Sequence, residues 1–98
     1  MAVYLISEVT VRDPAAFERY RALAAPSILA HGGKYLVRGG ERTLLEGGPE
    51  PSSLVILEFP DSAAVDRWYA SAEYAPARAI RDDALSRRLI MVEGVAPV

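Results

Sequence analysis

Two side chains that can transfer protons stand out in this sequence. His31 is the only histidine, and Glu58 lies within the apolar run from Leu54 to Phe59. A carboxylate left unpaired among apolar neighbours costs several kcal/mol, so Glu58 is expected to be paired, protonated or close to an opening. We therefore expect His31 and Glu58 to be catalytic residues that act as general acid or base.

Each of these side chains also has a structural interpretation. His31 comes directly before Gly32 at the expected end of a helix, where it can contact the terminal carbonyl groups and the negative end of the helix dipole. Glu58 can form an ion pair with Arg38 of the neighbouring expected strand, and that pair would be either structural or part of a binding site. The residues alone leave both alternatives open.

Cationic and phenolic side chains offer groups that can bind an acidic ligand. Arg38 carries a planar fork of donors that fits a carboxylate. Tyr74 and Arg81 are spaced i, i+7 and share one face of an expected helix. We expect Arg38, Tyr74 and Arg81 to bind a small organic acid as the substrate. The alternative for the helical pair is a solvated face whose charge Asp82 and Asp83 neutralise.

The composition argues against several kinds of chemistry. The chain has no cysteine, which removes disulfides and thiolate nucleophiles, and its single imidazole cannot complete a common transition-metal site. The glycine pairs at 39–40 and 47–48 do not join a strand to a helix, as the glycines of a phosphate-binding loop do. We therefore expect neither a metal nor a cofactor.

Charge and hydropathy limit the partners. The formal net charge of -2 and the pI near 5.3 give no electrostatic reason to bind nucleic acid or an anionic membrane. No apolar run approaches the ~20 residues of a membrane span, and the chain does not open with a basic and then apolar leader. Together with the lack of cysteine, these features lead us to expect a cytoplasmic protein.

The chain length and its periodicities predict one domain over residues 1–98. These 98 residues, 51% of them hydrophobic, suffice for one core. The period of two from Val3 to Val11 predicts a strand, and Asp13-Pro14 predicts the start of a helix. The other expected elements are a strand at 34–46 bent at its glycines, a loop at 47–53, a strand at 54–59, a helix from 62, a helical stretch at 73–85 and a strand at 88–93.

The order of these elements, βαββαβ, predicts a ferredoxin-like α+β sandwich. Long crossovers and one short central connection give a four-stranded antiparallel sheet with helices on one face. The other face of the sheet is expected to be apolar too, because it would carry Tyr4, Ile6, Leu36, Leu54, Ile56, Leu89 and Met91. Ile90 and Val92 would then face the helices.

This second apolar face predicts a partner. At roughly 100 Å² for each side chain, the patch would reach ~700 Å², more than the ~300–600 Å² found on ordinary monomers. Two-fold assemblies are the most common oligomers, and a second copy can cover such a face completely. We therefore expect a homodimer in which two sheets pack face to face.

Several short segments resemble one protein family. They are Tyr35-Leu36-Val37-Arg38-Gly39-Gly40 after His31-Gly32-Gly33, Val55-Ile56-Leu57-Glu58-Phe59-Pro60, Trp68-Tyr69 followed by Ser71-Ala72-Glu73-Tyr74, and Arg81 before a closing Val92-Glu93-Gly94. In this order, and over nearly the whole chain, they are similar to the domain of unknown function 1330 family within the dimeric α/β-barrel superfamily. The resemblance implies a ferredoxin-like subunit that dimerises through its sheet, and it implies no established activity.

Two functions fit these features. The first is a small-molecule-binding protein, in one form a cofactor-independent enzyme, that acts on a small aromatic or carboxylate-bearing metabolite. The second is a non-catalytic dimeric structural or ligand-binding module whose polar residues only satisfy the interface. Stabilisation by small carboxylates would favour the first, because a ligand that binds the native state raises the melting temperature.

Overall fold

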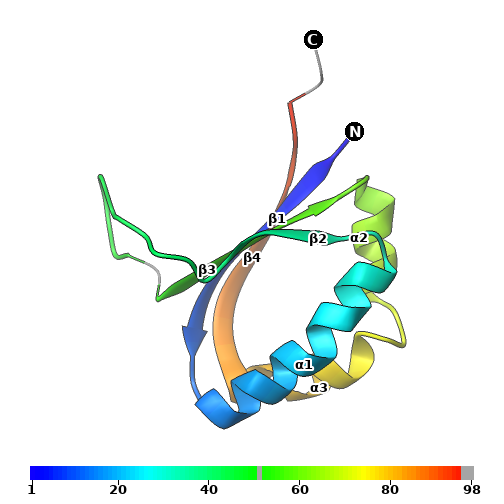
Figure 1. Cartoon of the computed structure of the whole chain (residues 1–98), viewed down its shortest axis with the longest axis horizontal. Coiled ribbons are helices and arrows are strands. Elements are labelled where there is room, and N and C mark those ends of the chain that lie inside the picture. Colours follow the sequence, from blue (N-terminus) through cyan, green and yellow to red (C-terminus); the bar gives the residue numbers. More distant parts are fainter. Residues whose placement is uncertain (51, 96–98) are drawn as a thin grey trace.

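The chain alternates between strands and helices, and Figure 1 shows its path in a computed structural model that describes residues 1–50 and 52–95. Pro51 of the expected loop and residues 96–98 lie outside the described part. The elements are β1 (Val3–Val11), α1 (Pro14–Ala30), β2 (Lys34–Arg38), β3 (Ser53–Phe59), α2 (Ser62–Tyr69), α3 (Ala75–Ala84) and β4 (Leu85–Glu93).

The four strands form one antiparallel sheet in the order β2-β3-β1-β4. The central strands β1 and β3 are each followed by a helical crossover, and both crossovers return over the same face. Figure 1 shows all three helices on this one side of the sheet. The expected ferredoxin-like α+β fold is therefore confirmed.

Aspartate caps begin two of the helices, and the first of them is at Asp13, where the sequence predicts a helix start. The Asp13 carboxylate accepts hydrogen bonds from the backbone N–H groups of Ala15 (3.1 Å) and Ala16 (3.4 Å) at the start of α1. Asp61 accepts one from Ala64 (2.8 Å) at the start of α2. Each cap satisfies amides that the first helical turn leaves free, so both helices begin directly after a strand.

Aromatic side chains form the centre of the core between the helices and the sheet. The largest fully buried ones are Trp68, Tyr74 and Phe59. The rings of Trp68 and Tyr74 have their centroids 4.3 Å apart, and Trp68 Nε1 donates a hydrogen bond to Ser27 Oγ at 3.0 Å. The indole thus has both apolar contacts and a polar partner, as a buried tryptophan requires.

β2 is shorter and more irregular than expected. The predicted strand at 34–46 ends at Arg38, because Gly39 follows with a φ of +69°, a left-handed conformation that favours glycine. A bulge between Tyr35 and Val37 shifts the register, so that Arg38 lies opposite Val55 on the side of the sheet that faces the helices. The bulge therefore re-aims the Arg38 side chain.

β4 presents the opposite faces from those expected. Ile90 lies opposite Ile6 on the face away from the helices, whereas Leu89 lies opposite Ser7 on the helix side. A register error of one residue exchanges the two faces of a strand. The prediction that Leu89 and Met91 point outward and Ile90 and Val92 inward is therefore wrong.

The face of the sheet away from the helices, here called the outer face, keeps an apolar centre after this correction. Its central cross-strand row consists of Val37, Ile56, Ile6 and Ile90, one residue from each strand. The flanking rows mix apolar and charged residues, namely Tyr4, Val92 and Leu54 with Lys34, Glu58, Glu8 and Arg88. Ile90 and Val92 are 37% and 44% exposed. An uncovered apolar surface thus exists where the sequence predicts one, with partly different members.

Gly33→Ala is expected to destabilise the fold. A Cβ at this position would lie 2.6 Å from Ile28 Cγ2 and 2.7 Å from Phe59 Cζ, and Phe59 is fully buried. Overpacking of this kind typically lowers the free energy of unfolding by ~1–3 kcal/mol. Gly40→Ala is the control, because a Cβ there meets nothing within 4 Å. Urea unfolding should show a lower midpoint for Gly33→Ala only; equal midpoints would contradict this close packing.

Candidate ligand-binding site

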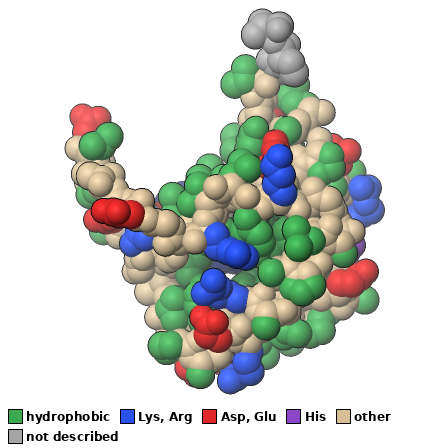
Figure 2. All heavy atoms as spheres, in the orientation of Figure 1, with side chains coloured by type: hydrophobic (Ala, Val, Ile, Leu, Met, Phe, Trp, Pro, Cys, Tyr) green, Lys and Arg blue, Asp and Glu red, His purple; other side chains and the backbone are tan. Residues whose placement is uncertain are grey.

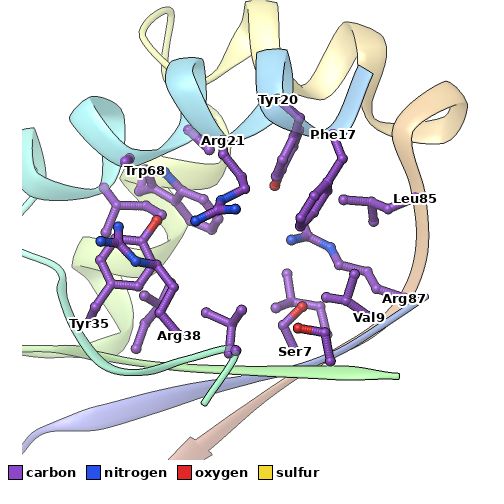
Figure 3. A pocket seen from close by; sticks show the side chains of 18 residues that line it. Ser7, Val9, Phe17, Tyr20, Arg21, Tyr35, Arg38, Trp68, Leu85 and Arg87 are labelled. Carbon is purple, nitrogen blue, oxygen red and sulfur yellow. The ribbon is translucent and has the colours of Figure 1, made fainter. Parts of the chain in front are cut away.

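A cavity of about 330 Å³ lies between α1 and the helix-facing side of the sheet. Figure 2 shows basic side chains close together in the middle of this face of the molecule. The volume lies within the ~300–1,000 Å³ typical of small-molecule sites. The lining side chains, shown in Figure 3, are Ser7, Val9, Phe17, Tyr20, Arg21, Ala24, Ala25, Ile28, Tyr35, Arg38, Gly39, Ser53, Val55, Leu57, Trp68, Leu85, Arg87 and Leu89.

The central part of the sheet forms the floor of this cavity. One cross-strand row on the helix side consists of Arg38, Val55, Ser7 and Leu89, in the order β2, β3, β1, β4. The next row consists of Ser53, Val9 and Arg87. Residues directly opposite one another share a face of the sheet. Ser7 therefore lies near the middle of the floor, with Arg38 at one edge and Arg87 at the other.

Arg38 lies at the β2 edge of the cavity against an aromatic ring. Its Cζ is 4.5 Å from the centroid of the Tyr35 ring, within cation–π range. Burial raises the pKa of the Tyr35 phenol, and the positive charges of Arg38 and Arg21 offset this effect only in part. The neutral Tyr35 side chain can thus hold the guanidinium in place at the cavity without neutralising its charge.

Arg87 lies at the β4 edge and is held by two tyrosines. Its Nη2 donates to the Tyr74 hydroxyl at 2.8 Å, and the hydroxyls of Tyr74 and Tyr20 are hydrogen-bonded at 2.8 Å. Burial raises the pKa of Tyr20, although the charge of Arg87 acts in the opposite direction. Tyr74 is fully buried. The two phenols therefore position the Arg87 guanidinium without neutralising its charge.

The charge of the cavity is positive. Arg21, Arg38 and Arg87 are among the lining residues, and no aspartate or glutamate is. Arg21, whose side chain is 47% exposed, pairs with Glu18 at 3.1 Å outside the lining. Arg38 and Arg87 form no ion pair with any carboxylate of residues 1–50 or 52–95. Such a site favours a ligand with an anionic group.

Ser7 adds a polar atom to the floor. The residue is 4% exposed, and its Oγ has no hydrogen-bond partner among the described residues. Figure 3 shows its side chain rising from the sheet toward the space between Arg38 and Arg87. The cavity thus contains one unpaired hydroxyl in addition to its cations.

The two predicted catalytic residues lie elsewhere. His31 is at the end of α1, where Nδ1 donates to the backbone oxygen of Ser27 at 2.9 Å, in agreement with its structural interpretation. Glu58 lies on the outer face and pairs with Lys34 at 3.5 Å. The expected pair with Arg38 is wrong, because the bulge turns Arg38 to the other face. The catalytic roles of His31 and Glu58 stay predictions, and neither side chain lines the cavity.

The three predicted substrate-binding residues have different positions. Arg38 lines the cavity directly. Tyr74 lies behind the wall and reaches the site only through its hydrogen bond with Arg87. Arg81 lines a separate, open cleft that shares Arg87 with the cavity, and it donates to the Tyr69 hydroxyl at 3.0 Å. The structure therefore brings Arg38 and Tyr74 to one site and Arg81 to its neighbour.

The sequence reasoning missed several lining residues, among them Ser7, Tyr20, Arg21, Tyr35 and Arg87. Ser7 had a usable signal, since it is a polar residue at an inward position of β1 between buried Leu5 and Val9. Arg87 had no such signal. It precedes the predicted start of the last strand at residue 88, so the prediction assigns it to neither face of the sheet. A longer predicted strand would have been needed to find it.

Two further observations concern metals and membranes. No group of three or more His, Asp or Glu side chains that could hold a metal ion occurs among residues 1–50 and 52–95. None of the helices in that part of the chain combines the length and the hydrophobicity that crossing a bilayer requires.

Known proteins resemble this chain in sequence and in structure. Residues 2–95 match the family model described as domain of unknown function DUF1330. A protein of unknown function from Rhodopseudomonas palustris has a similar structure, with 23% identity, a TM-score of 0.81, and coverage of 98% of this chain and 84% of that chain. No curated protein matches the chain.

The structures of an oxygenase and of a monooxygenase are similar as well. SnoaB, a cofactor-independent oxygenase from Streptomyces nogalater, has 20% identity and a TM-score of 0.67, over 99% of this chain and 96% of that chain. An antibiotic biosynthesis monooxygenase has 13% identity and a TM-score of 0.54, over 98% of this chain and 100% of that chain. At these identities, the similarities show a common fold.

Proposed function

This chain belongs to the domain of unknown function 1330 family, whose description gives no activity, and we propose from its cavity that it binds a small organic acid. The observation that carries this proposal is the set of three arginines at a cavity lined by no carboxylate. A guanidinium forms two parallel hydrogen bonds with a carboxylate, and a hydrogen bond to a charged group contributes ~1.5–3 kcal/mol.

The remaining lining residues indicate the body of the ligand. Most of the wall is apolar, and its aromatic members are Phe17, Tyr20, Tyr35 and Trp68. Such walls favour an apolar or aromatic skeleton, while the few polar groups fix its orientation. The proposed ligand is therefore a one- or two-ring aromatic carboxylate, or an apolar acid of similar size, with its carboxylate at Arg38.

The binding of matched acids and amides tests this function. Benzoate and 2-naphthoate should raise the melting temperature of the protein, and benzamide and 2-naphthamide should not, because only the acids carry the charge. Arg38→Gln should weaken benzoate binding roughly tenfold, the loss expected for one charge-assisted hydrogen bond of ~1.5 kcal/mol.

Arg19→Gln is the matched control for Arg38→Gln. Arg19 is exposed on α1 and does not line the cavity, so the variant should bind benzoate like the wild type. Equal increases in melting temperature with the acids and the amides would contradict recognition of the carboxylate. No shift with any of the four compounds would favour the non-catalytic module over a binding protein.

We also propose that the protein is a homodimer joined through its outer face. The apolar central row spans all four strands, and all three helices cover the opposite face. Burial of apolar surface stabilises an assembly by ~25 cal/mol per Å². A second copy presents the same surface, and two-fold symmetry brings the two rows together.

A further inference from the structure

We propose that Ser7 forms a second polar subsite at the floor of the cavity and selects acids that carry a hydroxyl or carbonyl oxygen on the side opposite the carboxylate. The inference rests on the proposed binding of an organic acid and narrows it to oxygenated aromatic acids. In this arrangement Arg38 binds the carboxylate and Ser7 binds the distal oxygen.

The unpaired hydroxyl of Ser7 is the first support. A buried hydroxyl without a partner costs about 1–3 kcal/mol, so native proteins nearly always satisfy such groups. Ser27, the other buried polar residue, follows that rule: its Oγ donates to the backbone oxygen of Ala24 at 2.6 Å and accepts from Trp68 Nε1 at 3.0 Å. Ser7 Oγ has no partner among the described residues, although the residue lines the cavity. A ligand atom can supply that partner.

The position of Ser7 within the register is the second support. Arg38 and Ser7 belong to the same cross-strand row and are separated by one strand, β3. Neighbouring strands lie ~4.8 Å apart, so the Cα atoms of these two residues are about 10 Å apart across the sheet. Both side chains rise from this face of the sheet. A ligand that lies over the floor of the cavity can therefore contact both of them.

The surroundings of Ser7 indicate the type of ligand oxygen. A hydroxyl can donate or accept a hydrogen bond, so it can serve either a phenol or a carbonyl. Arg87 lies one row away on the adjacent strand, a diagonal position from which a long side chain can reach the same ligand atom. A guanidinium only donates hydrogen bonds. Ser7 and Arg87 together therefore favour a ligand oxygen, which has lone pairs, over an N–H or a methyl group.

Calorimetric titration of benzoate, 3-hydroxybenzoate and 4-hydroxybenzoate into the wild type and Ser7→Ala tests this subsite. The wild type should bind at least one hydroxylated acid about tenfold more tightly than benzoate, the gain expected for one buried hydrogen bond. Ser7→Ala should lose this preference and keep its affinity for benzoate. Its melting temperature without ligand should equal or exceed that of the wild type, since the hydroxyl has no protein partner to lose.

Thr10→Ala is the matched control, because it removes an exposed hydroxyl from the same strand on the outer face, away from the cavity. It should keep the preference for the hydroxylated acid. Equal affinities of the wild type for all three acids would overturn the subsite while leaving acid binding intact. A similar loss of affinity for all three acids in Ser7→Ala would also overturn the subsite. A melting temperature of Ser7→Ala clearly below that of the wild type would do the same. Failure of the wild type to bind any acid would instead overturn the proposed function itself.

Discussion

Ile6→Asp is expected to separate the proposed dimer into single chains. Ile6 lies between Ile56 and Ile90 in the central row of the outer face. In a face-to-face dimer, both copies of the new carboxylate would enter an apolar interface, where each costs several kcal/mol. A loss of about 4 kcal/mol already raises the dissociation constant ~1,000-fold. The helix-side core stays unchanged, so the single chain should keep its circular dichroism spectrum.

Light scattering at micromolar concentration measures this effect. The wild type should have twice the chain mass of 10.6 kDa, and Ile6→Asp should have the mass of one chain. Thr10→Asp is the matched control: Thr10 lies on the same strand and face, is exposed, and is opposite Ser86 at the polar end of the sheet. A wild type with the mass of one chain, or equal dissociation of both variants, would show that the outer face is not the interface.

The element order and the helix starts could be predicted because local physics determines them. Asp13 and Asp61 cap helices through contacts within three residues along the chain, and these contacts need no tertiary information. The period of two in β1 is equally local, and it assigns Val3 and Leu5 to the core correctly. Each prediction of this kind depends on neighbours in sequence.

The face of each side chain on β2 and β4 could not be predicted in the same way. In β4 both alternating sets are apolar, Leu89 and Met91 on one side and Ile90 and Val92 on the other, so periodicity does not decide between them. In β2 a bulge interrupts the alternation. Only pairing with the neighbouring strand fixes the register in these two cases.

These two errors explain why the site was found only in part. The bulge separates Arg38 from Glu58 and brings it to the cavity, and the register of β4 brings Arg87 to the same cavity from the opposite edge. The two arginines are 49 positions apart in the sequence, and they meet only because β2 and β4 are the two edges of one curved sheet. The spacing of residues along the sequence therefore does not reveal that these two arginines lie at one site.

Arg87→Met is expected to weaken the binding of the preferred hydroxybenzoate by roughly 10- to 100-fold and that of benzoate far less, because Arg38 holds the carboxylate and Arg87 reaches the distal oxygen. The loss of a charge-assisted hydrogen bond accounts for ~1.5–3 kcal/mol of binding free energy. Stability should change little: the methionine keeps an unbranched apolar stem, and the Tyr74 hydroxyl keeps its hydrogen bond with Tyr20. Because no carboxylate of the described residues pairs with Arg87, the substitution also leaves no buried anion unpaired.

Two further variants separate the charge of Arg87 from its position. Tyr74→Phe keeps the cation but removes the phenol that holds it at 2.8 Å, so the affinity for the hydroxybenzoate should fall only a few-fold, as expected for the loss of one neutral hydrogen-bond partner. Arg88→Met changes the next residue, which lies on the outer face opposite Glu8, and should bind the hydroxybenzoate like the wild type. If Arg88→Met weakens binding as much as Arg87→Met does, the net charge of the protein attracts the ligand and the cavity does not bind it specifically.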